Sequence, residues 1–275
     1  MFMKGGSFLI QPIKIRKEMR KMRENELEYY SKIANWDFSS IKCETDFLTD
    51  WNYFEEIKKH TNERSLCLDL GTGGGEKVLK YFPDCAEIIA TDFSEEMINT
   101  ANESLKRSGK NNITFRTMDN LNMDTPDEYF DVVVARHTCI DAKQIYKTLK
   151  NGGKLLLRGV DKLDCWQLKR LFGKGQSYFD EKPISVIDYE NILDAGFKHV
   201  ELIPIHVREF YKTKEDLMAL LLKTPILMDF SEVEENDNLE LKGIDEKLID
   251  KYIEENTFEK GILLIRRYYG IIATK

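Results

Sequence analysis

Short apolar runs alternate with longer amphipathic segments from Ser65 onward. The apolar runs predict six strands, at Ser65–Leu70, Glu87–Thr91, Ile113–Thr117, Val132–Ala135, Lys154–Arg158 and His199–Ile205. The segments between them predict helices at Glu76–Tyr81, Glu95–Ser108, Lys143–Leu149 and Asp188–Ala195. Strands separated by single helices and short loops are typical of a parallel sheet with helices on both faces, so an α/β fold is predicted.

Helix boundary signals agree with this pattern. Ser94 is a predicted N-cap, and Gly109 ends the helix that it begins. Thr213–Asp216 has the capping-box pattern and opens a predicted helix over Leu217–Leu222. The apolar run Gly261–Ala273 predicts a last, long strand.

The chain divides into two unequal regions. Residues 1–64 contain two charged, partly amphipathic helical candidates, Ile13–Ile33 and Phe47–His60, and are interpreted as a helical N-terminal cap. Residues 65–275 are interpreted as one domain, with a helical insertion at about 211–259.

Composition narrows the class of protein. The 275 residues carry a net charge of −7, which gives no overall attraction to nucleic acid, although Lys14–Arg23 is locally basic. No apolar run approaches the ~20 residues that span a bilayer, so no membrane segment is expected. The five cysteines are scattered and include no C-x-x-C pair, which favours reduced thiols in a cytoplasmic protein without a metal site.

The segment Leu68–Gly75, with sequence LDLGTGGG, ends the first predicted strand in a glycine loop. Glycine permits positive φ and lets a ligand approach the bare backbone. A dinucleotide site needs a small residue at the sixth position of its G-x-G-x-x-G pattern, where Glu76 stands here. A phosphate-binding G-K-[ST] ending is absent too. The loop therefore favours a nucleoside ligand without phosphates.

Acidic residues recur at successive strand ends. Asp69 lies in the first strand, Asp92 follows the second, and Asp119 follows the third. A carboxylate at the second position can accept hydrogen bonds from ribose hydroxyls. Asp119 can accept one from an adenine amine, with Met118 and Phe93 as apolar walls around the base. Together these carboxylates predict a negative pocket that favours a cationic ligand.

Five motifs, in this order and spacing, resemble the class I S-adenosylmethionine-dependent methyltransferases: LDLGTGGG, ATDFSEEMI, TMDN, FDVVVARH and LKNGGKLLL. The resemblance covers about Ser65–Gly159 closely and the later strands loosely. It implies a Rossmann-like sheet of seven mostly parallel strands whose last strand is antiparallel, with Gly261–Ala273 as that strand. The chain departs from the family's commonest loop at Gly74, where a larger residue is frequent.

The resemblance also implies S-adenosylmethionine as the cofactor and a set of residues that bind it. In that scheme the glycines lie against the methionine part, Asp69 orients its amino group, Asp92 binds the ribose, and Asp119 binds the adenine. The implied cofactor-binding residues are Asp69, Gly71, Thr72, Gly73, Gly75, Asp92, Phe93, Met118, Asp119, Asn120 and Arg136.

The sequence indicates the residues around the methyl acceptor less clearly than those around the cofactor. His137 follows the fourth strand where cofactor and acceptor meet in the family, and is either a general base or a histidine that hydrogen-bonds backbone. His206 and Tyr211, and in the cap Tyr30 and Trp36, are candidates for the substrate pocket. Each has an alternative interpretation as an ordinary packing or surface residue.

The leading hypothesis is methyl transfer to a small molecule at an O, N or C atom. The N-P-P-[YF] motif of DNA adenine methyltransferases is absent after the fourth strand, which reads ARHTC. Two alternatives stay open: an RNA methyltransferase that uses Lys14–Arg23 as a backbone clamp, and a non-catalytic module that binds S-adenosylmethionine. The expected oligomeric state is a monomer or a homodimer.

Overall fold

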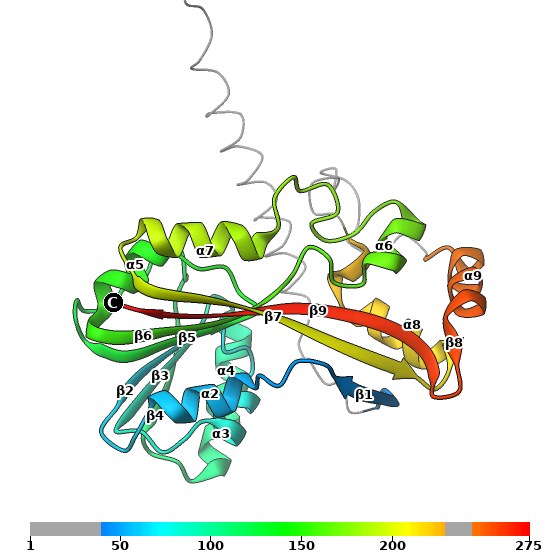
Figure 1. Ribbon diagram of the computed structural model, residues 1–275. Helices are drawn as coiled ribbons and strands as arrows, with labels where there is room; N and C mark the ends of the chain where they lie inside the picture. The colour runs from blue at the N-terminus through cyan, green and yellow to red at the C-terminus, as the bar shows by residue number, and fades with distance from the viewer. Residues whose placement is uncertain (1–39, 229–243) are drawn as a thin grey trace, which may run out of the picture.

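The computed structural model of the protein describes residues 40–228 and 244–275 (Figure 1). The helices are α2 (Tyr53–His60), α3 (Glu76–Tyr81), α4 (Glu95–Ser108), α5 (Ala142–Thr148), α6 (Trp166–Phe172), α7 (Ile184–Asp194), α8 (Lys214–Lys223), the 3₁₀ turn η1 (Pro225–Leu227) and α9 (Glu246–Asn256). The strands are β1 (Cys43–Phe47), β2 (Leu66–Leu70), β3 (Glu87–Asp92), β4 (Ile113–Thr117), β5 (Phe130–Arg136), β6 (Leu149–Val160), β7 (Lys198–Tyr211), β8 (Thr257–Phe258) and β9 (Gly261–Thr274).

One mixed sheet organises these elements, in the order β1-β7-β9-β6-β5-β2-β3-β4, with β8 paired to β9. Strands β2 to β6 pair in parallel, and β9 is antiparallel to both β6 and β7. The α/β class and the antiparallel last strand are confirmed. The expectation of seven strands is wrong, because the sheet has nine among the described residues.

The two additional strands lie at the far ends of β7 and β9. Strands β7 and β9 pair with each other along their whole length, well beyond the parallel part of the sheet (Figure 1). β1 pairs with the end of β7, and β8 forms a short hairpin with the start of β9. The expected helix Phe47–His60 is therefore only partly correct: its helical part is Tyr53–His60, and Cys43–Phe47 is an edge strand.

Local signals placed the helices of the parallel region well. The Ser94 hydroxyl accepts the Met97 amide at the start of α4, and Gly109 ends that helix in the left-handed conformation at φ +71°. Thr213 caps α8 in the same way through the Asp216 amide. Helix α6, between β6 and α7, was not predicted.

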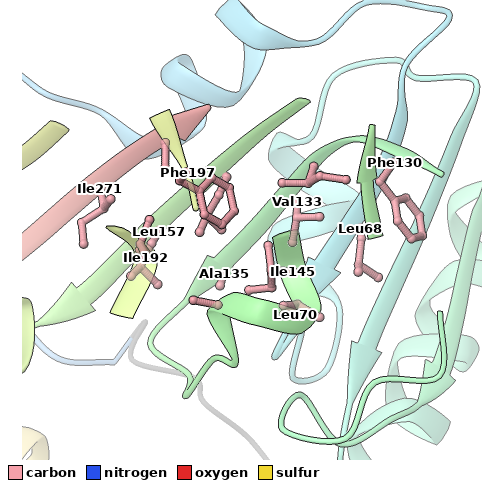
Figure 2. Packing of buried hydrophobic residues seen from close by; sticks show 14 of the residues in the cluster. Leu68, Leu70, Phe130, Val133, Ala135, Ile145, Leu157, Ile192, Phe197 and Ile271 are labelled. Atoms are coloured by element: carbon pink, nitrogen blue, oxygen red, sulfur yellow. The ribbon is translucent and has the colours of Figure 1, made fainter. Parts of the chain in front are cut away.

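Helices cover both faces of the sheet (Figure 1). On one face, α5 and α7 contribute Ile145 and Ile192 to a core that Figure 2 shows packed on Val133, Leu157 and Ile271. On the other face, α2, α3 and α4 pack over alternate residues of the same strands. Because successive strand residues point to opposite faces, Leu68 joins the first core while Asp69 points to the α2 face. No helix in the described part of the chain has the length and apolarity needed to cross a membrane.

A third hydrophobic cluster lies around the far ends of β7 and β9. Helices α6, α8 and α9 build it, and α8 and α9 lie within the range 211–259. Residues 229–243 and residues 1–39 lie outside the described residues.

Candidate active site

The glycine loop lies between the end of β2 and the start of α3. The backbone amides of Gly71 and Thr72 both donate to the Thr91 carbonyl at 2.8 Å, which holds the loop against β3. Gly71 has a φ of +74°, and a Cβ there would lie 2.7 Å from the Thr138 Cβ. Gly73 has a φ of +59°, but a Cβ there would meet no atom within 4 Å. Gly73 is therefore the glycine of this loop whose backbone faces open space, where a ligand can approach it.

Gly75 begins helix α3 in a closely packed position. It caps α3 at a φ of +78°, and a Cβ there would lie 2.7 Å from the Phe115 ring and 3.0 Å from Ala101. Close packing of α3 and α4 on the sheet accounts for glycine at this position.

Asp92, at the end of β3, is buried and holds the glycine loop through one carboxylate oxygen. Its Oδ2 accepts the Gly73 amide at 2.9 Å, and its Oδ1 accepts the Ser94 amide at 3.0 Å. Burial raises its pKa above the usual value, and these backbone amides oppose the shift. A carboxylate oxygen has two lone pairs, so each oxygen that accepts one amide can also accept a ribose hydroxyl.

Asp69 lies deeper, with 5% of its surface exposed. Burial raises its pKa to about 7, the Arg136 guanidinium opposes the shift, and the nearby Asp92 carboxylate adds to it. A cationic group next to Asp69 would favour the ionised carboxylate, so the site is electrostatically suited to an ammonium or sulfonium ligand.

The loop after β4 carries the next expected residues. The Met118 amide donates to the Asp92 carbonyl at 2.9 Å, which brings the ends of β3 and β4 together. The Met118 side chain is buried in the core beside α5. The Asp119 carboxylate accepts the Leu121 amide at 2.9 Å, and Asn120 donates to the Thr138 hydroxyl at 2.9 Å. Phe93, beside Asp92, is partly exposed.

A small cavity of about 30 Å³ joins the glycine loop to α2 and β5. Its lining residues are Tyr53, Phe54, Asp69, Gly71, Thr72, Lys77, Val78, Phe82 and Arg136. The buried hydroxyl of Tyr53 has no hydrogen-bond partner among the described residues, whereas the Thr72 hydroxyl lies close enough to Asp69 to lower the pKa of that carboxyl. Buried polar groups without partners are rare in folded proteins, so the Tyr53 hydroxyl indicates a place where a polar ligand binds.

His137 and its neighbours lie beyond Arg136. His137 adopts a φ of +56°, which is unusual for a residue other than glycine, and its ring contacts the Arg158 guanidinium. Desolvation lowers the pKa of His137 well below its usual value, and the charges of Arg158, Arg136 and Arg266 add to this shift. The residue keeps an exposed surface, so this neutral imidazole borders an accessible part of the site.

Two expected pocket residues lie elsewhere. Tyr211 is buried in the cluster of α6, α8 and α9, and its hydroxyl donates to Glu209 at 2.5 Å. His206 is exposed on the face of β7 opposite Ile205, since adjacent residues of a strand alternate. Neither lines the cavity beside the glycine loop. Tyr30 and Trp36 lie outside the described residues.

Sequence reasoning missed Tyr53, Arg158 and Tyr268. Arg136 directly follows the predicted fourth strand and Arg158 ends the fifth, and these positions were a signal that the two residues meet at one edge of the sheet. A larger open hollow of about 420 Å³ lies between the start of the parallel part of β6 and the end of β9, at the opposite edge. Its lining includes Lys154 and Thr274 but none of the expected cofactor residues.

The residues present fit S-adenosylmethionine. Gly73 has open space for the methionine part, the unpaired Tyr53 hydroxyl lies beside the loop, and Asp69 and Asp92 provide negative charge. The described residues place no group of three or more His, Cys, Asp or Glu side chains where they could hold a metal ion.

Comparison with known proteins agrees with this fit. The family described as "Methyltransferase domain" matches residues 67–158. The chain is 27% identical over 97 residues to the uncharacterized methyltransferase YcgJ of Bacillus subtilis, a match that covers 33% of this chain and 38% of YcgJ. It is 28% identical over 183 residues to phosphoethanolamine N-methyltransferase of Plasmodium falciparum, covering 58% of this chain and 67% of that protein.

The fold agrees as well. The crystal structure of Bacillus subtilis YcgJ superimposes with a TM-score of 0.52 and 16% identity, over 81% of this chain and 97% of that chain. The sequence match to YcgJ spans well under half of that protein's length. Residues 67–158, a third of the chain, therefore match a methyltransferase domain in sequence, and the surrounding fold agrees with that match.

Proposed function

We propose that the protein transfers a methyl group from S-adenosylmethionine to a small-molecule acceptor. The observation that carries this proposal is the arrangement of Gly73, Asp69 and Asp92 at the carboxyl ends of β2 and β3. An open glycine backbone lies there beside two buried carboxylates. Ligands of open α/β sheets bind at this edge.

The chain's own residues account for binding and alignment. Asp92 accepts the ribose hydroxyls, Asp69 accepts the amino group of the methionine part, and Asp119 accepts the adenine amine. Bound S-adenosylmethionine supplies a methyl group on a positively charged sulfur. What remains for the protein is to hold the acceptor atom in line with the methyl–sulfur bond, and such positioning can contribute ~7–11 kcal/mol.

His137 is the candidate for the acceptor's proton. Burial lowers its pKa well below the usual value, so its imidazole is neutral near pH 7. A guanidinium only donates hydrogen bonds, so Nε2 of His137 accepts from Arg158 in the free protein, and it would act as a base once Arg158 turns to a ligand. The proton that the acceptor loses would then carry the positive charge that the cofactor brings.

One observation favours a small acceptor. The phosphoethanolamine N-methyltransferase of Plasmodium falciparum, by its name, acts on a small molecule. The basic stretch Lys14–Arg23, on which the RNA alternative depends, lies outside the described residues.

Calorimetric titration with S-adenosylhomocysteine and S-adenosylmethionine tests the proposal. We expect micromolar binding by the wild type and at least a tenfold loss in Asp92→Ala. Asp84→Ala is a matched control, because Asp84 lies before β3 at the opposite edge of the sheet. If Asp92→Ala binds as well as the wild type, the ribose assignment is wrong.

The two alternatives predict other results. An RNA methyltransferase would bind RNA with an affinity that falls steeply with salt concentration. A non-catalytic module would bind the cofactor tightly yet release no S-adenosylhomocysteine with any acceptor in a broad small-molecule panel.

A further inference from the structure

Two arginines lie side by side next to the proposed methyl-transfer site. Arg136 ends β5 and is the register partner of Arg158 on β6. Partners in a parallel pair point to the same face of the sheet, here the face that α2 covers. Arg136 lines the cavity beside the glycine loop, and Arg158 lies one strand further from it.

Aromatic and imidazole groups hold Arg158 in place. Its guanidinium carbon lies 4.1 Å from the centre of the Tyr268 ring, in cation–π geometry, and a guanidinium nitrogen contacts His137. The Tyr268 and His137 rings lie 5.6 Å apart. None of these partners carries the negative charge that would neutralise the guanidinium.

A third arginine on the same face, Arg266, is neutralised by carboxylates and serves as a comparison for Arg158. Arg266 lies 5.2 Å from the Tyr268 ring centre on the same strand, and pairs with Asp164 at 3.0 Å and Glu209 at 3.1 Å. By contrast, no carboxylate of residues 40–228 or 244–275 forms an ion pair with Arg158, and the carboxylate that Arg136 influences is Asp69, outside ion-pair distance.

Unpaired charge at this position is unfavourable. Burial lowers the pKa of Arg158 to about 10, and repulsion from Arg136 and Arg266 contributes in the same direction, against the effect of Tyr268. A partly buried guanidinium without an anion has lost hydration that nothing replaces. An anionic ligand would supply the missing partner, and the planar fork of a guanidinium suits a carboxylate or phosphate.

We propose that the methyl acceptor carries an anionic oxyacid group, a carboxylate or a phosphate, that binds to Arg158 with Arg136 beside it. The inference rests on the proposed function, because it assigns the acceptor half of that same site. The site then has two electrostatic halves: carboxylates of β2 and β3 for the cationic cofactor, and arginines of β5 and β6 for the anionic acceptor.

The cofactor's own carboxylate could also reach Arg136, and the experiment must separate the two. The protein is therefore first saturated with S-adenosylhomocysteine, which carries that carboxylate. Inorganic phosphate or acetate is then titrated into the complex, at constant ionic strength maintained with chloride, and binding is followed by calorimetry and by the melting temperature.

We expect saturable binding of at least one of the two anions to the wild-type complex, and at least tenfold weaker binding in Arg158→Gln. The affinity of Arg158→Gln for S-adenosylhomocysteine should stay within about twofold of wild type, which also shows that the variant folds. Arg158→Lys keeps the charge without the fork and should lose less. Arg64→Gln is the control, because Arg64 is exposed before β2 at the other edge of the sheet.

The outcomes are distinguishable. A wild-type complex that ignores both anions overturns the inference and leaves the proposed function standing. A folded Arg158→Gln variant that loses S-adenosylhomocysteine binding also overturns the inference, because the arginine would then bind the cofactor. If the wild type fails to bind S-adenosylhomocysteine in the first titration, the proposed function itself fails. A response to phosphate alone indicates a phosphate ester, and a response to acetate alone indicates a carboxylic acid.

Discussion

The guanidinium of Arg266 on β9 forms a bidentate ion pair with the carboxylate of Asp164, which follows β6. Nε lies 3.0 Å from Oδ1, and Nη2 lies 3.2 Å from Oδ2. Both side chains are buried, and Oδ1 also accepts the Arg267 amide at 2.7 Å. The pair therefore ties the segment after β6 to the extended part of the sheet, one residue away from the start of the third hydrophobic cluster at Cys165.

Asp164→Asn should destabilise the protein by ~3 kcal/mol, because it leaves the buried Arg266 charge short of a partner. Urea denaturation measures this change in the free energy of unfolding. The control is Asp127→Asn, which removes an exposed ion pair to Lys147 and should change little. Equal losses in the two variants would mean that the buried pair has no special role.

Gly73→Ala should weaken S-adenosylhomocysteine binding at least tenfold. The new methyl group would occupy the open space in which the ligand's methionine part lies in our proposal. Gly109→Ala provides a matched control, since Gly109 also has positive φ and a methyl group added there would also meet nothing within 4 Å. Both variants should lose a similar ~1–2 kcal/mol of stability from left-handed strain. Calorimetry and urea denaturation separate the two effects, and equal binding by both variants would argue against a ligand at Gly73.

Tyr53→Phe should make the ligand-free protein more stable, by about 1 kcal/mol, because the buried hydroxyl that it removes has no partner among the described residues. It should also weaken cofactor binding several-fold if that hydroxyl bonds the ligand. Tyr252→Phe is the opposite case, because the Tyr252 hydroxyl donates to the Leu263 carbonyl at 2.9 Å, and its loss should destabilise. Thermal unfolding with and without S-adenosylhomocysteine measures both effects. A destabilised Tyr53→Phe would show that the hydroxyl has a partner in the free protein.

Cofactor binding should strengthen as the pH rises through about 7. Asp69 has a pKa of about 7 in the fold, raised by burial, and the ionised carboxylate is the form that accepts the cofactor's amino group. Binding then releases a proton from Asp69 below this pH. Asp69→Asn should remove the part of the pH dependence that Asp69 causes, as calorimetry at pH 6, 7 and 8 would show.

The stability of the free protein provides an independent check on Asp69. Its folded pKa lies above the unfolded value of 3.8, so the folded state holds the proton more tightly. This group's contribution to stability is therefore present at low pH and is lost as the pH rises from about 4 to about 7. The melting temperature of Asp69→Asn relative to wild type should increase over that range. A constant difference would contradict the raised pKa.

Much of the cofactor half could be predicted because its determinants are local. Strand β2, the glycine loop and α3 follow one another directly, and Asp92 lies two positions before the Ser94 cap of α4. Parallel pairing with short connections then brings these strand ends to one edge, whatever the rest of the chain does. The reason for Gly75 was not local, because Phe115 comes from β4.

The acceptor half depends on contacts between distant segments. Tyr211 and His206 were sensible candidates by position, but β7 continues past the parallel region, which buries Tyr211 in another cluster and turns His206 to the other face. Strand β1 was missed because its pattern is that of an edge strand, with little buried surface and pairing only to β7.

The sequence by itself determined the α/β class, the glycine loop and the order of acidic strand ends, because each is encoded by neighbours in the chain. Only the tertiary structure decided that Arg158 lacks a neighbouring anion. Arg136 meets Arg158 through the pairing of β5 with β6, and Arg266 is neutralised by Asp164, 102 positions away. Whether a charged side chain is neutralised depends on all the charged groups packed around it, and these come from distant segments that meet only when the strands have paired in the sheet.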